Sequence, residues 1–142
     1  MVELSDEKVL YAFDRALEPA LVVPSGTTVR VRTKDCFGNQ VQRPEDELDE
    51  IDWDHINPAT GPIFVEGAVP GGALKVTIEA IEFDGQTASC TGEGEGVCGD
   101  RFDAWSTHLC KIDGDELVWD EELRIPLRPM IGVIGVAPAG EP

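Results

Sequence analysis

The chain has 142 residues, enough for one compact domain, and a hydrophobic fraction of 42% that can supply a core. Its 28 acidic and 11 basic side chains give a formal net charge of -17, which repels phosphate backbones and anionic membrane surfaces. The composition therefore predicts no nucleic-acid partner and no membrane partner.

The start of the sequence and its cysteines bear on the compartment. Residues 1–7 are acidic where the first region of a signal peptide is basic, and no apolar run is long enough to cross a bilayer. The cysteines lack the paired Cys-x-x-Cys spacing of a zinc ribbon, so free thiols in a reducing compartment are expected. They are Cys36, Cys90, Cys98 and Cys110. We expect a cytoplasmic protein, in which only Cys90 and Cys98, flanking a Gly-rich loop, could approach one another.

The first half of the sequence contains more strand signals than helix signals. Residues 5–10 allow one helical turn, and residues 27–33 alternate apolar and polar side chains, as a half-buried strand does. Residues 44–52 begin with a proline and acids, which suit a helix N-terminus, but lack an apolar stripe, so they predict a short helix or an acidic loop. Residues 74–78 alternate again, and the phase slips before Ile81, which suggests a β-bulge.

The second half of the sequence predicts two hairpins. Their turns are Asp84-Gly85 and Asp113-Gly114, both typical of two-residue connections between strands. The strand pairs would be residues 81–83 with 87–89 and residues 108–112 with 117–119. Residues 123–127 predict a further strand, in which Pro126 indicates an edge or a bulge. The apolar run 130–137 predicts a buried strand or a backbone packed close to a neighbour.

Taken together, many short strands separated by turns predict an all-β sandwich or barrel with few or no helices. We expect residues 1–142 to form a single β domain.

Polar side chains follow two of these strands. Asp35, Asn39 and Gln40 lie just beyond the first alternating strand, and Glu66 ends a short apolar run beside a glycine. Two carboxylates of this kind can hold a metal that lowers the pKa of a water, or one of them can act as a general base. The ordinary alternative is a pair of solvated loop carboxylates.

Three sequence blocks then carry a resemblance to a known family. They are residues 35–40 (DCFGNQ), residues 57–68 (NPATGPIFVEGA) and residues 128–138 (RPMIGVIGVAP). In order and spacing they resemble the blocks of the acetamidase/formamidase family, and the resemblance covers roughly residues 17–142. It implies hydrolysis of small linear amides such as formamide and acetamide to a carboxylate and ammonia. It also implies a β-sandwich of jelly-roll type and a divalent metal, zinc or calcium, at the site.

The resemblance implies roles for four residues. Asp35 and Glu66 match acidic positions of the family blocks, so we expect them to be catalytic residues and metal ligands that lie close together. Asn39 and Gln40 would bind the substrate and donate hydrogen bonds to the oxyanion. Two oxygen ligands are too few for a tight zinc site, which wants three protein ligands. We therefore expect the metal to need groups from elsewhere.

The sequence also departs from the family pattern. The family continues past the third block into a segment rich in Gly and His and then a second half, whereas this sequence stops at Pro142. We therefore expect a truncated, cleaved or split enzyme that is incomplete alone and forms a homo-oligomer or binds a second-half chain. The alternatives are a non-catalytic remnant or assembly half, and a ligand-binding jelly roll.

Other candidate residues fit structural roles better. We expect His55 and His108 to be surface or structural histidines. Cys36 is a weak candidate nucleophile, because the neighbouring Asp35 raises a thiol's pKa and no base is evident.

Overall fold

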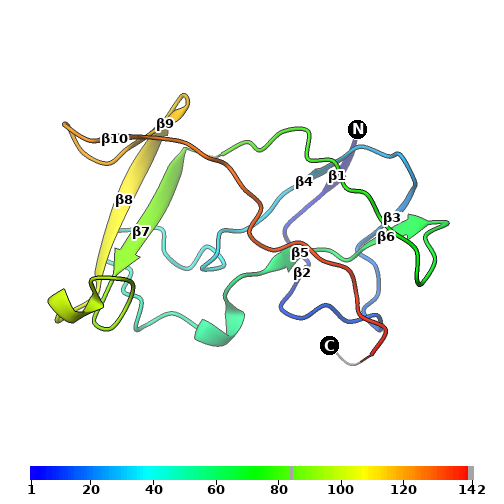
Figure 1. Ribbon diagram of the computed structural model, residues 1–142, viewed down its shortest axis with the longest axis horizontal. Helices are drawn as coiled ribbons and strands as arrows, with labels where there is room; N and C mark the ends of the chain where they lie inside the picture. Colours follow the sequence, from blue (N-terminus) through cyan, green and yellow to red (C-terminus); the bar gives the residue numbers. More distant parts are fainter. Residues whose placement is uncertain (84, 141–142) are drawn as a thin grey trace. The chain divides into compact units, whose positions relative to one another are not determined.

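A computed structural model of the chain describes residues 1–83 and 85–140 (Figure 1). These residues contain ten short β-strands and two 3₁₀ turns, η1 (Trp53–His55) and η2 (Gly99–Arg101), and no longer helix. The predicted all-β class with few helices is confirmed. The described residues also include no helix that is long and apolar enough to cross a membrane.

The strands belong to two compact units, each assembled from segments that are distant in the sequence. Unit 1 comprises Met1–Gly38, Asp54–Ile78 and the described residues from Ile131 onward, whereas unit 2 comprises Asn39–Trp53 and the described part of Glu79–Met130. The expectation that residues 1–142 act as a single domain stays a prediction.

Unit 1 is built from three two-stranded sheets. They pair β1 (Val2–Leu4) with β4 (Val29–Val31), β2 (Val9–Leu10) with β5 (Ala59–Thr60), and β3 (Leu21–Pro24) with β6 (Ile63–Glu66). The β1–β4 and β3–β6 pairs are parallel and the β2–β5 pair is antiparallel. Leu4 and Val23 are the buried apolar side chains that these strands contribute to the core. The predicted strand at 27–33 is confirmed as β4.

Unit 2 contains one antiparallel sheet in the order β10–β9–β8–β7. Its strands are β7 (Gln86–Thr91), β8 (Ser106–Asp113), β9 (Glu116–Val118) and β10 (Arg124–Pro126). The predicted hairpin between residues 108–112 and 117–119 is confirmed, with Ile112 opposite Leu117. Its turn lies one residue later than predicted, at Gly114-Asp115, because Asp113 belongs to β8 and pairs with Glu116; Gly114 adopts a φ of 60°. The strand at 123–127 is also confirmed, and β10 lies at the sheet edge, as Pro126 predicts.

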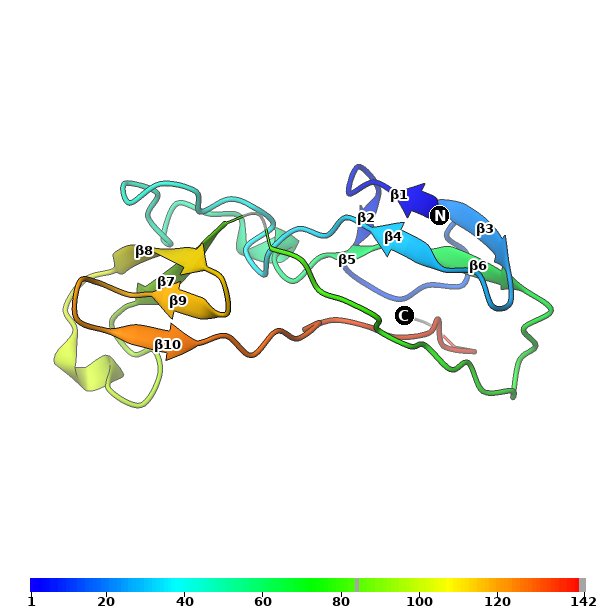
Figure 2. The same cartoon turned by 90° about the horizontal axis from the view of Figure 1, so that it is seen from above.

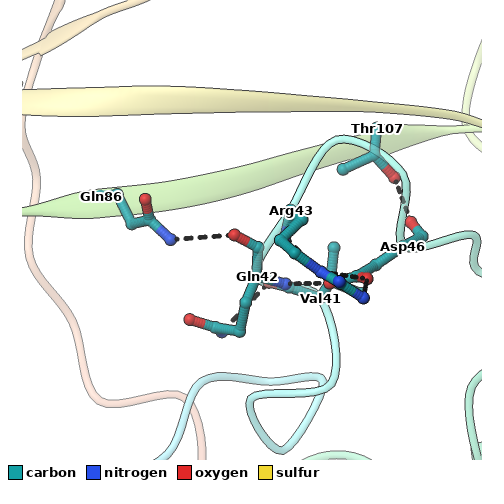
Figure 3. A network of polar contacts seen from close by, with 6 residues as sticks. All are labelled: Val41, Gln42, Arg43, Asp46, Gln86 and Thr107. Atoms are coloured by element: carbon teal, nitrogen blue, oxygen red, sulfur yellow. Dashed lines mark hydrogen bonds and ion pairs between the residues drawn. The ribbon is translucent and has the colours of Figure 1, made fainter.

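The loop 41–48 covers part of this sheet. Val41 and Leu48 on the loop and Cys110 on β8 are at most 2% exposed, which makes them the best-buried side chains of unit 2. The loop is tied to β7 and β8 by two hydrogen bonds, from the Gln86 Nε2 to the Gln42 carbonyl at 3.3 Å and from the Thr107 hydroxyl to the Asp46 carbonyl at 3.1 Å (Figure 3). Of the two structures predicted for 44–52, the acidic loop is therefore the one that forms.

Several predicted elements are wrong. Residues 5–10 form a turn followed by β2 rather than a helical turn, because residues 9–10 pair with β5. Residues 74–78 form no strand, so the β-bulge expected after them is absent too. Residues 81–83 form no strand either, and β7 pairs instead with β8; Asp84, in the predicted turn, lies outside the described residues.

The apolar run 130–137 forms no strand, but its second interpretation is confirmed at one position. A Cβ placed on Gly135 would come within 2.8 Å of the Phe13 ring, so the backbone lies directly against that side chain. A second tie in unit 1 joins the Arg15 guanidinium to the Ala139 carbonyl at 2.8 Å.

Candidate functional site

The first candidate residue, Asp35, shapes its own turn. Its Oδ1 accepts a hydrogen bond from the Phe37 N–H at 3.0 Å, and its carbonyl accepts one from the Gly38 N–H at 3.0 Å. This is the way in which Asp stabilises a turn two residues on, and Gly38 supplies the positive φ of 67° that the turn needs. Asp35 is exposed on this turn, so the same carboxylate that orders the backbone also faces solvent.

The start of the first sequence block and the strand before it lie beside the start of the second block in unit 1. The Asn57 N–H donates to the Cys36 carbonyl at 2.6 Å, and the Thr60 hydroxyl donates to the Arg32 carbonyl at 2.8 Å. Asn57 adopts a positive φ of 52°, which is uncommon for a residue with a side chain and best tolerated by Asn or Asp. The polar start of the second block thus has a defined backbone conformation and is hydrogen-bonded to the Asp35 turn.

Glu66 lies at the other end of the second block. It is the last residue of β6, it is exposed, and it lies opposite Pro24 of β3. Figures 1 and 2 both show β5 and β6 following one another in one direction. Asp35 precedes Cys36, whose carbonyl pairs with Asn57 at the start of the second block, whereas Glu66 ends β6 further along that block. Their roles as catalytic residues and metal ligands stay predictions.

Asn39 and Gln40, the predicted substrate-binding residues, belong to unit 2. Asn39 is exposed in a turn with a positive φ of 63°. The Gln40 side-chain amide binds the backbone of Asp52 at both of its ends, accepting from the N–H at 2.8 Å and donating to the carbonyl at 3.2 Å. Gln40 therefore joins the two ends of the loop 41–51, which is a structural role. Binding of substrate by Asn39 and Gln40 stays a prediction.

Both histidines are held by aromatic neighbours. The His55 ring meets the edge of Tyr11 at a centroid distance of 4.8 Å. His108 stacks on Trp119 at 4.3 Å, and its Nε2 lies 2.7 Å from the Trp119 carbonyl. These contacts fit the structural role expected of His108. Cys36 and the three other cysteines are free thiols, and burial raises the pKa of Cys110.

A shallow pocket of about 250 Å³ in unit 1 was not anticipated from the sequence. It adjoins the second block at Gly61 and Pro62, and most of its lining is apolar. Its lining also includes Tyr11 and Lys8, whose ammonium donates to the Glu18 carbonyl. The pocket could hold a small neutral molecule.

The residues present do not make a complete metal site. Among the described residues, no group of three or more His, Cys, Asp or Glu side chains is close enough to hold a metal ion. Since a tight zinc site needs three protein ligands, these carboxylates do not fit such a metal by themselves.

Comparison with known proteins identifies the class to which this fold and these blocks belong. The model of the Acetamidase/Formamidase family matches residues 3–141, and the chain therefore belongs to that family. The match includes the N-terminal strands β1 and β2, which the resemblance of the three blocks did not cover. Curated proteins gave no match.

Three solved structures resemble the chain. An acetamidase from Bacillus halodurans is 41% identical with a TM-score of 0.93, over 99% of this chain and 48% of its own. A predicted acetamidase/formamidase from Thermoanaerobacter tengcongensis is 46% identical with a TM-score of 0.90, over 96% of this chain and 46% of its own. An acetamidase from Yersinia enterocolitica, at 17% identity and a TM-score of 0.66 over 88% of this chain and 42% of its own, shares the fold alone. The chain thus spans about half the length of each.

Proposed function

We propose that this chain is part of an amidase that hydrolyses small linear amides, such as formamide and acetamide, to a carboxylate and ammonia. One observation carries the proposal: the chain superposes over 99% of its length on an acetamidase at a TM-score of 0.93 and 41% identity. A cytoplasmic location and the absence of nucleic-acid and membrane partners belong to the same proposal.

Within this proposal, Glu66 is the better candidate for the general base. Amide hydrolysis needs a group that takes a proton from water as the water attacks the carbonyl carbon. In the described part of the chain no hydrogen bond or ion pair engages the Glu66 carboxylate, which lies exposed at the end of β6. Asp35, whose carboxylate holds its turn, would position the second block, and Asn39 and Gln40 would bind the amide.

A divalent metal, zinc or calcium, stays part of the proposal only with ligands from outside the described residues. Because no three His, Cys, Asp or Glu side chains gather among the described residues, Asp35 and Glu66 would each contribute to a site completed by other groups.

The test measures ammonia released from formamide and acetamide. The 142-residue chain would be assayed alone and together with the remaining part of the Bacillus halodurans acetamidase, the part outside the region that this chain covers, which we term the complementary fragment. We expect no release by the chain alone and release by the pair, with Glu66→Gln lowering the rate far more than Asp35→Asn. Absence of release, when the fragment restores activity to the first part of its own acetamidase, would refute the proposal.

A second candidate function is a non-catalytic assembly half that only binds another chain. Many large apolar side chains are exposed in unit 1, among them Ile134 and Val136, which favours a surface that another polypeptide covers. The two functions differ in the assay above, because an assembly half binds the complementary fragment without releasing ammonia.

A further inference from the structure

The segment 73–78 has the sequence pattern of a β-strand but none of the backbone hydrogen bonds of a sheet. Leu74, Val76 and Ile78 alternate with polar residues, which is the period of a β-strand with one apolar face. Figures 1 and 2 draw this segment as an extended trace between the turn after β6 and unit 2, without an arrow. Its three apolar side chains are 47%, 58% and 53% exposed. We term these three side chains the 74–78 stripe.

The backbone of the segment is open as well. Among the described residues, none of residues 73–78 takes part in a hydrogen bond with another part of the chain. Exposed backbone N–H and C=O groups can bind water, but an apolar alternating segment whose backbone groups have no protein partner is a template for strand addition. Both the apolar stripe and the free backbone groups therefore indicate a strand whose partner lies outside the described chain.

We infer that the 74–78 stripe is a docking edge, onto which the polypeptide equivalent to the complementary fragment adds a β-strand. This inference rests on the proposed function, because the acetamidases that the chain matches are about twice as long. The chain as a whole superposes on these longer proteins at TM-scores of 0.93 and 0.90.

A second copy of the chain fits this edge less well. Each copy carries a formal net charge of -17, so two copies repel one another over the whole surface. At low ionic strength these charges are not screened, so strand addition between two identical copies would have to overcome the repulsion. The complementary fragment is therefore the occupant to test.

The test follows hydrogen–deuterium exchange of residues 73–78 in the full 142-residue chain, alone and with the complementary fragment. We expect fast exchange alone and exchange slowed at least about tenfold in the mixture, because new main-chain hydrogen bonds protect the amides. Binding that leaves residues 73–78 unprotected would overturn the inference. So would absence of binding, provided that the fragment associates with the first part of its own acetamidase.

A matched pair of variants separates the two faces of the segment. Val76→Asp places a charge in the stripe and should weaken binding of the fragment by at least about tenfold, because a buried Val is replaced by a desolvated carboxylate. Thr77→Asp makes the same charge change on the other face and should change the affinity by less than about threefold. Val76 is more than half exposed in the chain alone, so circular dichroism should show both variants folded. Equal losses for the two variants would contradict a one-faced edge.

The inference and the proposed function fail differently. Protection of residues 73–78 without ammonia release keeps the docking edge and refutes the amidase. Ammonia release without protection keeps the amidase and refutes the edge. Sedimentation of the chain alone completes the set: a dimer that Val76→Asp dissociates and Thr77→Asp does not would assign the stripe to a second copy and overturn the chosen occupant.

Discussion

The β8–β9 hairpin and the segment 74–78 begin from the same sequence pattern and end differently. Both alternate apolar and polar residues, but Ile112 and Leu117 face each other across a two-residue turn and are half-buried, whereas the 74–78 stripe stays exposed. The hairpin partner lies a few residues away in the sequence, so forming it costs little loop-closure entropy. Alternation thus supplies a tendency to form a strand, and the presence of a partner decides whether the strand forms.

The largest expected effect comes from deleting a buried side chain on the paired region. Leu48 is 2% exposed and packs in unit 2, so Leu48→Ala should lower the free energy of unfolding by about 2–5 kcal/mol. Leu74→Ala, the same substitution in the unpaired segment, should change it by less than about 0.5 kcal/mol, because Leu74 is 47% exposed. Urea unfolding of the 142-residue chain measures both. Equal losses would mean that the segment 74–78 is already packed in the isolated chain.

A glycine pair gives a second comparison of packed and open backbone. A Cβ on Gly92 would lie 2.3 Å from the Trp105 ring, so Gly92→Ala must displace the indole and should cost about 1–3 kcal/mol. A Cβ on Gly132 would meet no atom within 4 Å, so Gly132→Ala should be near neutral. Trp fluorescence reports displacement of the indole, and the thermal midpoint of unfolding reports the stability of each variant. An unchanged thermal midpoint for Gly92→Ala would show that the loop 92–99 does not rest on Trp105.

The parts of this fold that sequence predicted are those set by local chemistry. The hairpin signalled by Asp113-Gly114 and the edge position of Pro126 follow from residue types that favour one backbone conformation. Both form, although the turn itself is Gly114-Asp115, one residue later than predicted. The parallel pairs β1–β4 and β3–β6 join segments that are distant in the sequence, and no local pattern indicates which strands meet. The helical turn that residues 5–10 allowed does not form for the same reason, since residues 9–10 pair with the distant strand β5.

The candidate site shows the same division. The family blocks were recognisable in the sequence, and the family is confirmed. The sequence could not indicate that Asp35 would order its own turn or that Gln40 would clamp Asp52, because both depend on backbone groups that the fold brings into reach.

A smaller effect should follow pH in the loop 41–48. The Arg43 guanidinium, together with the N–H groups of Gln42 and Arg43, lowers the pKa of Asp46 to about 2 from its ordinary value of 3.8. Because the folded pKa is the lower one, the stabilisation is complete above pH 3.8 and is lost as the pH falls toward 2. The difference in unfolding free energy between the native chain and Asp46→Asn should therefore shrink over this range. A difference independent of pH would show that Asp46 is not held as a carboxylate.

The smallest effect is expected at the outer edge of the hairpin. The Arg124 guanidinium lies 3.1 Å from an Asp113 oxygen and 3.2 Å from a Glu116 oxygen, and all three side chains are well exposed. Exposed ion pairs contribute little and are screened by salt, so Arg124→Ala should shift the urea midpoint only slightly. The loss should be clearest at low salt, where removing one of 11 cations from a chain of net charge -17 also increases self-repulsion. Arg101→Ala removes the same charge from η2, and in the described part of the chain Arg101 has no ion pair. If both variants shift the midpoint equally at every salt concentration, the effect belongs to net charge, and the hairpin owes its stability to its turn and its cross-strand apolar pairs alone.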